Sequence, residues 1–266
     1  MTVPYAEVIG DPIGHSKSPI IHKFWLEKLG IEGDYRPVRV RSDRLEEHLQ
    51  SRRADPNWRG CNVTAPHKIA VIPFVDQLFM HGEVVRAVNT VFREGDSLAG
   101  NNSDLTGYLR SLQKLPLHRD SAFIIGAGGA ARAALMAVHA MGFESICVTN
   151  RTAERASAML QALGVKASVQ SFDAPVPAAD LVVNASAMSA EGSSFDLSPL
   201  PPRAIVFDIV VQPVETPLLV AARRRGLRTI DGLTMLIEQA EYGFLRFFHA
   251  QAPREADAEL RELLTR

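Results

Sequence analysis

The residues best suited to bind a ligand form a glycine-rich turn at residues 126–131. An apolar run at 122–125 enters this turn, and a helix-like segment at 132–138 leaves it. Glycines let a backbone pass close to phosphates, and the first turn of a helix offers N–H groups at a positive dipole end. The order of strand, glycine turn and helix therefore predicts a pyrophosphate-binding loop, although flavin and S-adenosylmethionine sites use similar turns.

The end of the next apolar run, at 145–148, indicates which nucleotide the loop takes. An acidic side chain about 20 residues after the glycines would bond the ribose 2′-hydroxyl and select NAD. This chain has Asn150, Arg151 and Thr152 at that place, with Arg155 one turn later. Because a guanidinium matches phosphate in shape and charge, we expect NADP. Either arginine alone could also be a solvated charge at the start of a surface helix.

Two serines lie in the loop at 10–19, between a strand-like run and a helix. The hydroxyls of Ser16 and Ser18, two residues apart beside a helix start, could hold a small carboxylate or a polyol. Ser18 could instead be the N-cap, with Pro19 at the first helical position. Ser16 has no such structural role that the sequence predicts.

Three further places in the first part of the chain could carry chemistry. Lys68 follows the strand-like run 60–64 and is either a partly buried lysine that moves a proton or a solvated lysine of a first helical turn. Asn89 could bind a ligand or cap a hairpin. Asp104 could act in catalysis or cap the helix that follows it.

Strand-like and helix-like segments alternate along most of the chain, which is typical of an α/β fold with parallel sheets. Near-continuous apolar runs in the middle of the chain indicate strands covered on both faces. The strands are predicted at 5–10, 35–40, 60–64, 122–125, 145–148, 166–169, 181–184, 205–211 and 227–230, and a hairpin at 88–100 turns at 94–96. The helices are predicted at 19–29, 43–51, 218–225, 235–250 and 255–264.

We predict two domains from this order. Residues 1–103, completed by 236–266, form an α/β substrate-binding and catalytic domain, and residues 104–235 form a Rossmann-type NADP-binding domain. The C-terminal helices would pack back on the first domain. A cleft between the domains is the usual place for a substrate beside its nicotinamide.

Composition is that of an ordinary enzyme. With 266 residues and a formal net charge of −1, the chain gives no reason to expect nucleic acid or a membrane surface as a partner. Cys61 and Cys147 lie in apolar runs, so we expect buried thiols in a reducing cytoplasm. His15, His22 and His67 occur singly, and no pair of Cys or His has ligand spacing, so we expect no metal.

Taken together and in order, these segments resemble the shikimate dehydrogenase family over nearly the whole chain. The family-like blocks lie at 10–19, 60–68, 87–90, 100–107, 126–131, 150–152, 208–219 and 232–239. Glutamyl-tRNA reductase and methylenetetrahydrofolate dehydrogenase share parts of this design. The first needs a nucleophilic cysteine, which the context of Cys61 does not suggest, and the second does not match the block with Ser16 and Ser18.

The resemblance implies reversible reduction of 3-dehydroshikimate to shikimate with NADPH. It implies Lys68 and Asp104 as the catalytic pair, at an oxygen that must be stabilised and protonated, and leaves open which is the formal acid or base. The implied substrate-binding residues are Ser16, Ser18, Thr64, Asn89 and Gln239. The implied NADP-binding residues are Gly126, Ala127, Gly128, Gly129, Ala130, Asn150, Arg151, Thr152, Arg155, Ile209 and Gly232.

Several positions depart from the family pattern. Val211 replaces a tyrosine whose hydroxyl helps to bind the substrate carboxylate, a loss of roughly 1.5–3 kcal/mol of binding. Ser103 stands where threonine is usual, Arg86 where glycine is usual, and the loop at 184–192 is irregular. A quinate or aminoshikimate dehydrogenase, or a ligand-binding relative without activity, therefore stays an alternative, and the chain could be a monomer or a homodimer. Retention of both Lys68 and Asp104 argues against the inactive relative.

Overall fold

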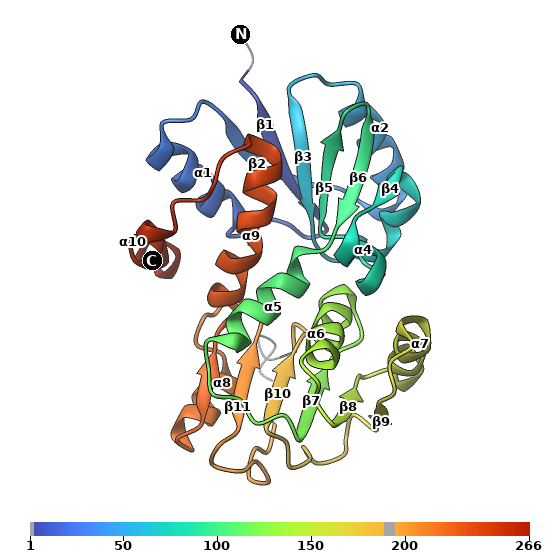
Figure 1. The fold of residues 1–266 in the computed structure, drawn as a ribbon, viewed down its shortest axis with the longest axis vertical. Coiled ribbons are helices and arrows are strands. Elements are labelled where there is room, and N and C mark those ends of the chain that lie inside the picture. The colour runs from blue at the N-terminus through green and yellow to red at the C-terminus, as the bar shows by residue number, and fades with distance from the viewer. Residues whose placement is uncertain (1–2, 189–194) are drawn as a thin grey trace. The chain divides into compact units, whose positions relative to one another are not determined.

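The computed structural model describes residues 3–188 and 195–266, and the chain divides into two compact units (Figure 1). The first unit contains Met1–Ser103 and Gln239–Arg266, and the second contains Asp104–Glu238. Each unit is built on its own six-stranded sheet. The assignment of one unit to the substrate and the other to the cofactor stays a prediction.

The sheet of the first unit has the order β2-β1-β3-β5-β6-β4 and is mixed rather than wholly parallel. β5 runs antiparallel to both β3 and β6, because the predicted hairpin is present and turns between Glu94 and Ser97. Gly95 has φ +61° there, a conformation that glycine adopts without cost. The strands are β1 Tyr5–Gly10, β2 Asp34–Arg39, β3 Trp58–Val63, β4 Gln77–Leu78, β5 Thr90–Glu94 and β6 Ser97–Asn101.

Two hydrophobic cores cover the two faces of this sheet, as the period-two alternation of strand side chains requires. Cys61 and Val91 face Leu45 and Leu49 of α2 on one side. Ala6, Val8 and Phe92 face Phe247 of α9 on the other side, so the C-terminal part of α9 packs on the first unit as predicted. The helices of this unit are α1 Ser18–Leu29, α2 Leu45–Arg53, α3 His67–Ala70, α4 Met80–Val85 and α10 Asp257–Thr265, while α9 Gly232–Phe248 begins in the second unit.

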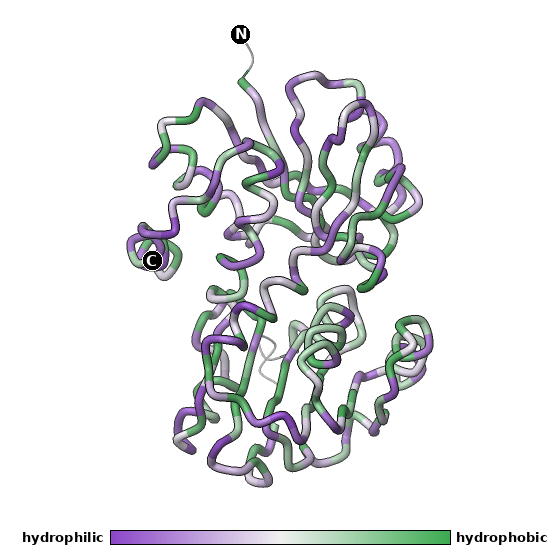
Figure 2. The backbone as a smooth tube through the Cα atoms, viewed as in Figure 1, coloured by the Kyte–Doolittle hydropathy of each residue, from purple (hydrophilic) through white to green (hydrophobic). Residues whose placement is uncertain are grey.

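The sheet of the second unit is wholly parallel and has the order β12-β11-β10-β7-β8-β9. Numbered from β7, this is the strand order 3-2-1-4-5-6 of the dinucleotide-binding fold. The strands β7, β10 and β11 consist mainly of hydrophobic residues (Figure 2), and these residues are buried on both faces of the sheet. The strands are β7 Ser121–Ile125, β8 Ser145–Thr149, β9 Ser168–Gln170, β10 Leu181–Asn184, β11 Ile205–Asp208 and β12 Arg228–Ile230.

Helices of the second unit follow the strands in the order that the sequence predicts. They are α5 Ser103–Gln113, α6 Gly129–Ala140, α7 Ala153–Leu163 and α8 Pro217–Arg224. β11 ends at Asp208 rather than at residue 211, because the Asp208 carboxylate accepts hydrogen bonds from the Val210 N–H and the Thr216 hydroxyl, which turns the chain. No helix in the described part of the chain is long and apolar enough to cross a membrane.

His22 of α1 is wholly buried among aromatic rings in the first unit. Its ring stacks on Tyr35 with the centroids 3.9 Å apart, and Trp25, Phe244 and Phe247 surround it. Neither ring nitrogen has a hydrogen-bond partner, and burial lowers the pKa of His22 to about 3. The imidazole is therefore neutral in the folded protein.

We predict that His22→Phe removes part of the acid sensitivity of the fold. The folded pKa lies below the unfolded value of 6.5, so stability is full above that value and is lost as the pH falls toward 3. Between about pH 7 and pH 5, wild type should lose about 2 kcal/mol more free energy of unfolding than His22→Phe. Urea unfolding at both pH values measures this, with the exposed His139→Gln as control. Equal losses in wild type and His22→Phe would contradict it.

Candidate active site

Strand direction collects the polar residues of the first unit at one edge of its sheet. The carboxyl ends of the parallel strands β1 and β3 lie at this edge. β5 is antiparallel to β3, so its amino end, preceded by Asn89, lies at the same edge, and so does the carboxyl end of β6, followed by Ser103. The pairing thus brings together segments that the sequence separates by dozens of residues.

The two serines of the first loop have roles opposite to those expected. α1 begins at Ser18 itself, and its N-cap is Lys17, which makes no side-chain cap bond. The Ser16 hydroxyl accepts the backbone N–H of Ser18 at 3.3 Å, so Ser16 has the local structural role that the sequence did not predict. Ser18 is buried, and its hydroxyl is left to bond outside the helix backbone.

Thr64 and Lys68 follow β3, and the segment at Thr64 is held against the first loop. A Cβ on Gly10 would lie 2.5 Å from Thr64 Cγ2, so only glycine allows the two loops to approach this closely. Buried His67 bonds the Val40 carbonyl at 2.6 Å, and the Lys68 carbonyl accepts the Val88 N–H at 2.6 Å. The backbone of Lys68 is therefore fixed to the segment before β5, and its side chain is half-buried.

Asn89 is the centre of the polar cluster at this edge. Its Nδ2 donates to Ser103 Oγ at 3.0 Å and to Gln239 Oε1 at 3.1 Å. Its Oδ1 accepts the Ser103 N–H at 2.8 Å and the Thr90 hydroxyl at 3.0 Å. Asn89 therefore does more than cap the hairpin, because it joins the loop, the start of α5 and α9.

Three residues that the sequence analysis did not single out complete this cluster. Tyr35 Oη donates to Asn62 Oδ1 at 2.6 Å, and Asn62 Nδ2 donates to Thr90 Oγ1 at 3.2 Å. All three side chains are buried. A polar Asn62 between Cys61 and Val63, inside a strand otherwise apolar, was the one signal that could have revealed them.

Asp104 belongs to the second unit. α5 begins at Ser103, so Asp104 lies inside the first turn of the helix rather than at its cap. The carboxylate is buried. Burial raises the pKa of the Tyr108 phenol well above its ordinary value, and the charges of Asp104 and Asp208 raise it further. Since Lys68 belongs to the first unit, the pairing of Lys68 with Asp104 stays a prediction.

The predicted cofactor residues of the second unit lie at the carboxyl edge of its parallel sheet. Residues 126–130 follow β7, residues 150–155 follow β8, Ile209 follows β11, and Gly232 comes after β12. In this fold the ligand binds at the edge where the strand order reverses, which here is between β7 and β10. Gly126 lies at that point, with φ +121°, and a Cβ there would lie 3.0 Å from the Ala185 carbonyl oxygen.

Gly128 tests whether a phosphate group fits this loop. It is the N-cap of α6 but has no side chain with which to cap the helix, and its φ of −89° is ordinary for any residue. A Cβ on Gly128 would meet no heavy atom of the described residues within 4 Å. Neither backbone conformation nor packing thus requires glycine here, while a ligand held against the helix N-terminus would. The residues present fit a dinucleotide.

The remaining cofactor positions are fixed by local contacts. Asn150 Nδ2 donates to the Thr152 carbonyl at 2.8 Å, and Thr152 is the N-cap of α7, which places Arg151 and Arg155 at its start. A Cβ on Gly232 would lie 2.5 Å from the Ile209 carbonyl oxygen, so glycine lets α9 begin against this segment. The predicted cofactor positions thus lie at one edge of the sheet, and their roles stay predictions.

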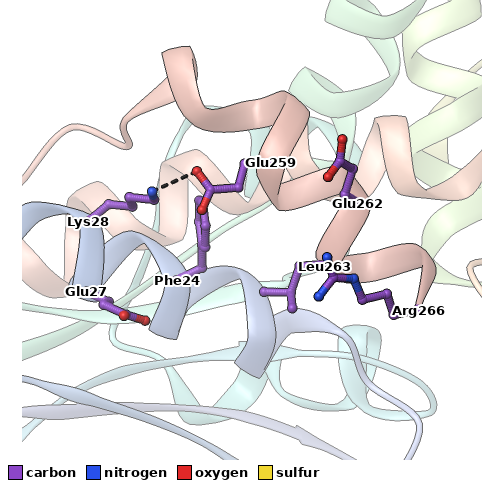
Figure 3. Close-up of a pocket in the computed structure, with 7 residues that line it drawn as sticks. All are labelled: Phe24, Glu27, Lys28, Glu259, Glu262, Leu263 and Arg266. Carbon is purple, nitrogen blue, oxygen red and sulfur yellow. Dashed lines mark ion pairs between the residues drawn. The ribbon is translucent and has the colours of Figure 1, made fainter.

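A separate pocket of about 460 Å³ lies between α1 and α10 in the first unit (Figure 3). Phe24 and Leu263 line it, and Lys28 Nζ bonds Glu259 Oε2 at 2.7 Å across it. None of the predicted substrate residues lines this pocket.

Comparison with known proteins decides the family. The family model "Shikimate dehydrogenase substrate binding domain" matches residues 8–91, and "Shikimate / quinate 5-dehydrogenase" matches residues 110–195. A shikimate dehydrogenase (NADP(+)) of Sphingopyxis alaskensis is 48% identical over 98% of this chain and 97% of the relative. This chain belongs to the shikimate dehydrogenase family.

Solved structures of the family share the fold. Shikimate 5-dehydrogenase of Thermus thermophilus, in complex with NADP(H) and shikimate, has a TM-score of 0.86 and 31% identity, covering 98% of this chain and 100% of that chain. Quinate dehydrogenase of Corynebacterium glutamicum, in complex with NAD, has a TM-score of 0.84 and 28% identity, covering 98% and 99%.

Two departures from the family pattern can be placed. Arg86 ends α4 in the left-handed region, with φ 51° and ψ 40°. Glycine, usual in the family at this place, adopts that conformation without cost, and arginine does so at about 1 kcal/mol. Val211 lies in the segment between β11 and α8. The irregular loop at 184–192 lies partly outside the described residues.

We predict that alanine at Gly126 mainly lowers stability, whereas alanine at Gly128 mainly weakens NADP binding. Gly126→Ala should lower the free energy of unfolding by about 1–3 kcal/mol, because φ is +121° and the Ala185 carbonyl lies close. Gly128→Ala should lower the free energy of unfolding by at most about 1 kcal/mol, the cost of alanine at an N-cap. It should weaken NADP binding about tenfold or more, since its Cβ would occupy space at the helix N-terminus where a phosphate would bind. Urea unfolding and fluorescence titration measure these effects. Unchanged NADP affinity in Gly128→Ala would contradict the assignment.

Proposed function

We propose that this protein is an NADP-dependent shikimate dehydrogenase that reversibly reduces 3-dehydroshikimate to shikimate. Membership of the family supports this, with relatives named for that activity along the whole chain. The observation that carries it is the pair of sheet edges. One edge brings together hydroxyls, amides and Lys68. The other brings together the glycine loop and, after β8, Arg151, which we propose binds the 2′-phosphate.

The proposed cofactor site lies at the carboxyl edge of the second sheet. Residues 126–130 would hold the pyrophosphate with backbone N–H groups, and Arg151 and Arg155 would hold the 2′-phosphate. Asn150, Thr152, Ile209 and Gly232 would complete the contacts. Bound NADPH would supply the hydride.

Lys68 and Asp104 are the proposed catalytic residues. Reduction of a ketone leaves negative charge on its oxygen, which must be stabilised and must gain a proton. The Lys68 ammonium can do both, and the Asp104 carboxylate can orient that ammonium or exchange the proton with it. In the oxidation direction the same pair would remove the hydroxyl proton.

The proposed substrate site uses the polar edge of the first sheet. Ser16 and Ser18 would bind the carboxylate, and Thr64, Asn89 and Gln239 would bind ring hydroxyls. Hydroxyls and amides suit a substrate with several hydroxyl groups, because each can donate and accept.

Val211 supports one second candidate, a dehydrogenase that prefers quinate or an aminated analogue. Without the usual tyrosine hydroxyl, the carboxylate end of the substrate is held by fewer donors. Such an enzyme would use the same Lys68 and Asp104 with another acid.

The setting proposed for this activity is the cytoplasm, with the protein as a monomer or homodimer and without nucleic acid or membrane as partner. Cys61 and Cys147 are both unpaired, and burial raises the pKa of the Cys61 thiol. A buried thiol with a raised pKa is unreactive, which suits a structural role in a reducing compartment.

The first test is an initial-rate assay that follows reduced-nicotinamide absorbance with shikimate or quinate and NADP or NAD. We expect turnover with shikimate and NADP, and a loss of at least about a hundredfold in kcat for Lys68→Ala, since proton transfer by a positioned side chain contributes about that much or more. Lys28→Ala, on the last turn of α1, is the matched control. Faster turnover of quinate would favour the second candidate, and NADP binding without any turnover would contradict both.

Arg151→Ala tests the choice of nucleotide. Loss of a charge-assisted contact to the 2′-phosphate should raise KM for NADP by roughly ten- to a hundredfold and leave KM for NAD nearly unchanged. Arg228→Ala is the control. Arg228 is the first residue of β12 and therefore lies at the amino ends of the parallel strands, away from the carboxyl ends where the proposed cofactor residues lie. An equal loss for both nucleotides would remove the argument for a 2′-phosphate contact.

A further inference from the structure

A chain of buried hydrogen bonds runs behind the proposed substrate site in the first unit. Tyr35 Oη donates to Asn62 Oδ1 at 2.6 Å. Asn62 Nδ2 donates to Thr90 Oγ1 at 3.2 Å, and Thr90 Oγ1 donates to Asn89 Oδ1 at 3.0 Å. Asn89 Nδ2 then donates to Gln239 Oε1 at 3.1 Å. We call Tyr35, Asn62, Thr90, Asn89 and Gln239 the amide relay.

The bonds of the amide relay have mutually consistent directions, and two backbone groups anchor them. Asn62 Nδ2 also donates to the Asn89 carbonyl at 3.3 Å, and Asn89 Oδ1 also accepts the Ser103 N–H at 2.8 Å. Because the Tyr35 hydroxyl is a donor, Asn62 presents its oxygen to Tyr35 and its amino group to Thr90. Thr90 accepts that bond, so its own proton goes to the oxygen of Asn89. The amino group of Asn89 therefore points to Gln239, whose oxygen accepts it.

The side chain at position 35 must be long to reach Asn62, and a tyrosine meets this requirement. Tyr35 lies on β2, opposite Ala6 on β1, and Asn62 lies on β3, so the Tyr35 side chain must cross a whole strand. The strand it crosses carries the small Ala6, wholly buried on the same face as Tyr35. A phenol is long enough to span this gap.

α1 holds the Tyr35 ring from the other side. His22, one helical turn after Ser18, stacks on the ring with planes 7° apart. Burial raises the pKa of the Tyr35 phenol well above its ordinary value, and a side-chain hydrogen bond with Ser18 opposes this rise. The phenol therefore stays protonated and remains a donor, and it also contacts the helix that carries Ser18.

We propose that Tyr35 is a positioning residue for the substrate, because its hydroxyl is the partner of the Asn62 oxygen and so helps to hold the amides of Asn89 and Gln239 in place through Asn62 and Thr90. This inference rests on the proposed function, in which Asn89 and Gln239 bind ring hydroxyls. Tyr35 does not act on the reacting atoms. Its removal should weaken binding of the ring hydroxyls and leave the chemical step intact.

The test is Tyr35→Phe, which removes one oxygen from a wholly buried side chain. We expect KM for shikimate to rise about three- to tenfold, as for the loss of one neutral hydrogen bond, with kcat within about twofold and KM for NADP unchanged. Thr90→Val removes the hydroxyl that links Asn62 to Asn89 and should give the same result. Thr90→Ser keeps the hydroxyl and should restore the wild-type KM.

Tyr5→Phe is the matched control. Tyr5 lies on the same sheet, is also buried, and donates to Asp55 Oδ2 at 2.7 Å outside the amide relay. It should lose stability in urea unfolding as Tyr35→Phe does, without a change in KM for shikimate. If Tyr35→Phe does not fold, the Thr90 pair decides.

Three results would overturn the inference. One is a KM for shikimate in Tyr35→Phe or Thr90→Val equal to that of wild type. Another is the same rise in Tyr5→Phe, which would show a general effect of lost stability. The third is a fall of kcat together with a rise of KM for NADP in Tyr35→Phe, which would also indicate a general effect of lost stability. Failure of wild type to oxidise shikimate would overturn the proposed function, and this inference with it.

Discussion

Strand pairing is the constraint on which the candidate site depends. Parallel strands bring their carboxyl ends to one edge of a sheet, and each unit has its candidate functional residues at that edge. In the first unit the hairpin of β5 and β6 reverses direction, which adds Asn89 and Ser103 to the loops after β1 and β3. A register shift of β5 by one residue would turn the side chains of β5, that of Thr90 among them, to the other face of the sheet.

Close backbone approach is the second requirement, and glycine meets it at defined points. Gly10 lets the first loop meet the Thr64 segment, and Gly232 lets α9 begin against Ile209. Gly128 differs from both, because no atom of the described residues lies within 4 Å of where its Cβ would be. Arg86 shows the reverse case, a side chain accepted in a left-handed conformation at a helix end where the family uses glycine.

Local patterns were enough to predict β1, β10 and the hairpin, because each depends on residues close in sequence. They were not enough for Ser18, since cap preference favours serine at the N-cap, whereas α1 begins at Ser18 itself with Lys17 as its N-cap. Strand β4 has two residues and pairs only with β6, so no periodicity reveals it. The Tyr35–Asn62 bond crosses β1 and depends on a register that local patterns do not specify.

In the proposed function, the amide relay links stability to substrate binding in one set of atoms. Buried amides and hydroxyls are costly unless each is paired, so Asn62, Thr90 and Asn89 are stable only in mutually consistent orientations. These orientations are set within the first unit, whereas Val211 belongs to the second. If Val211 weakens carboxylate binding as proposed, recognition of ring hydroxyls should therefore persist. An enzyme so built would vary in which hydroxylated acid it prefers while keeping its requirement for the hydroxyls.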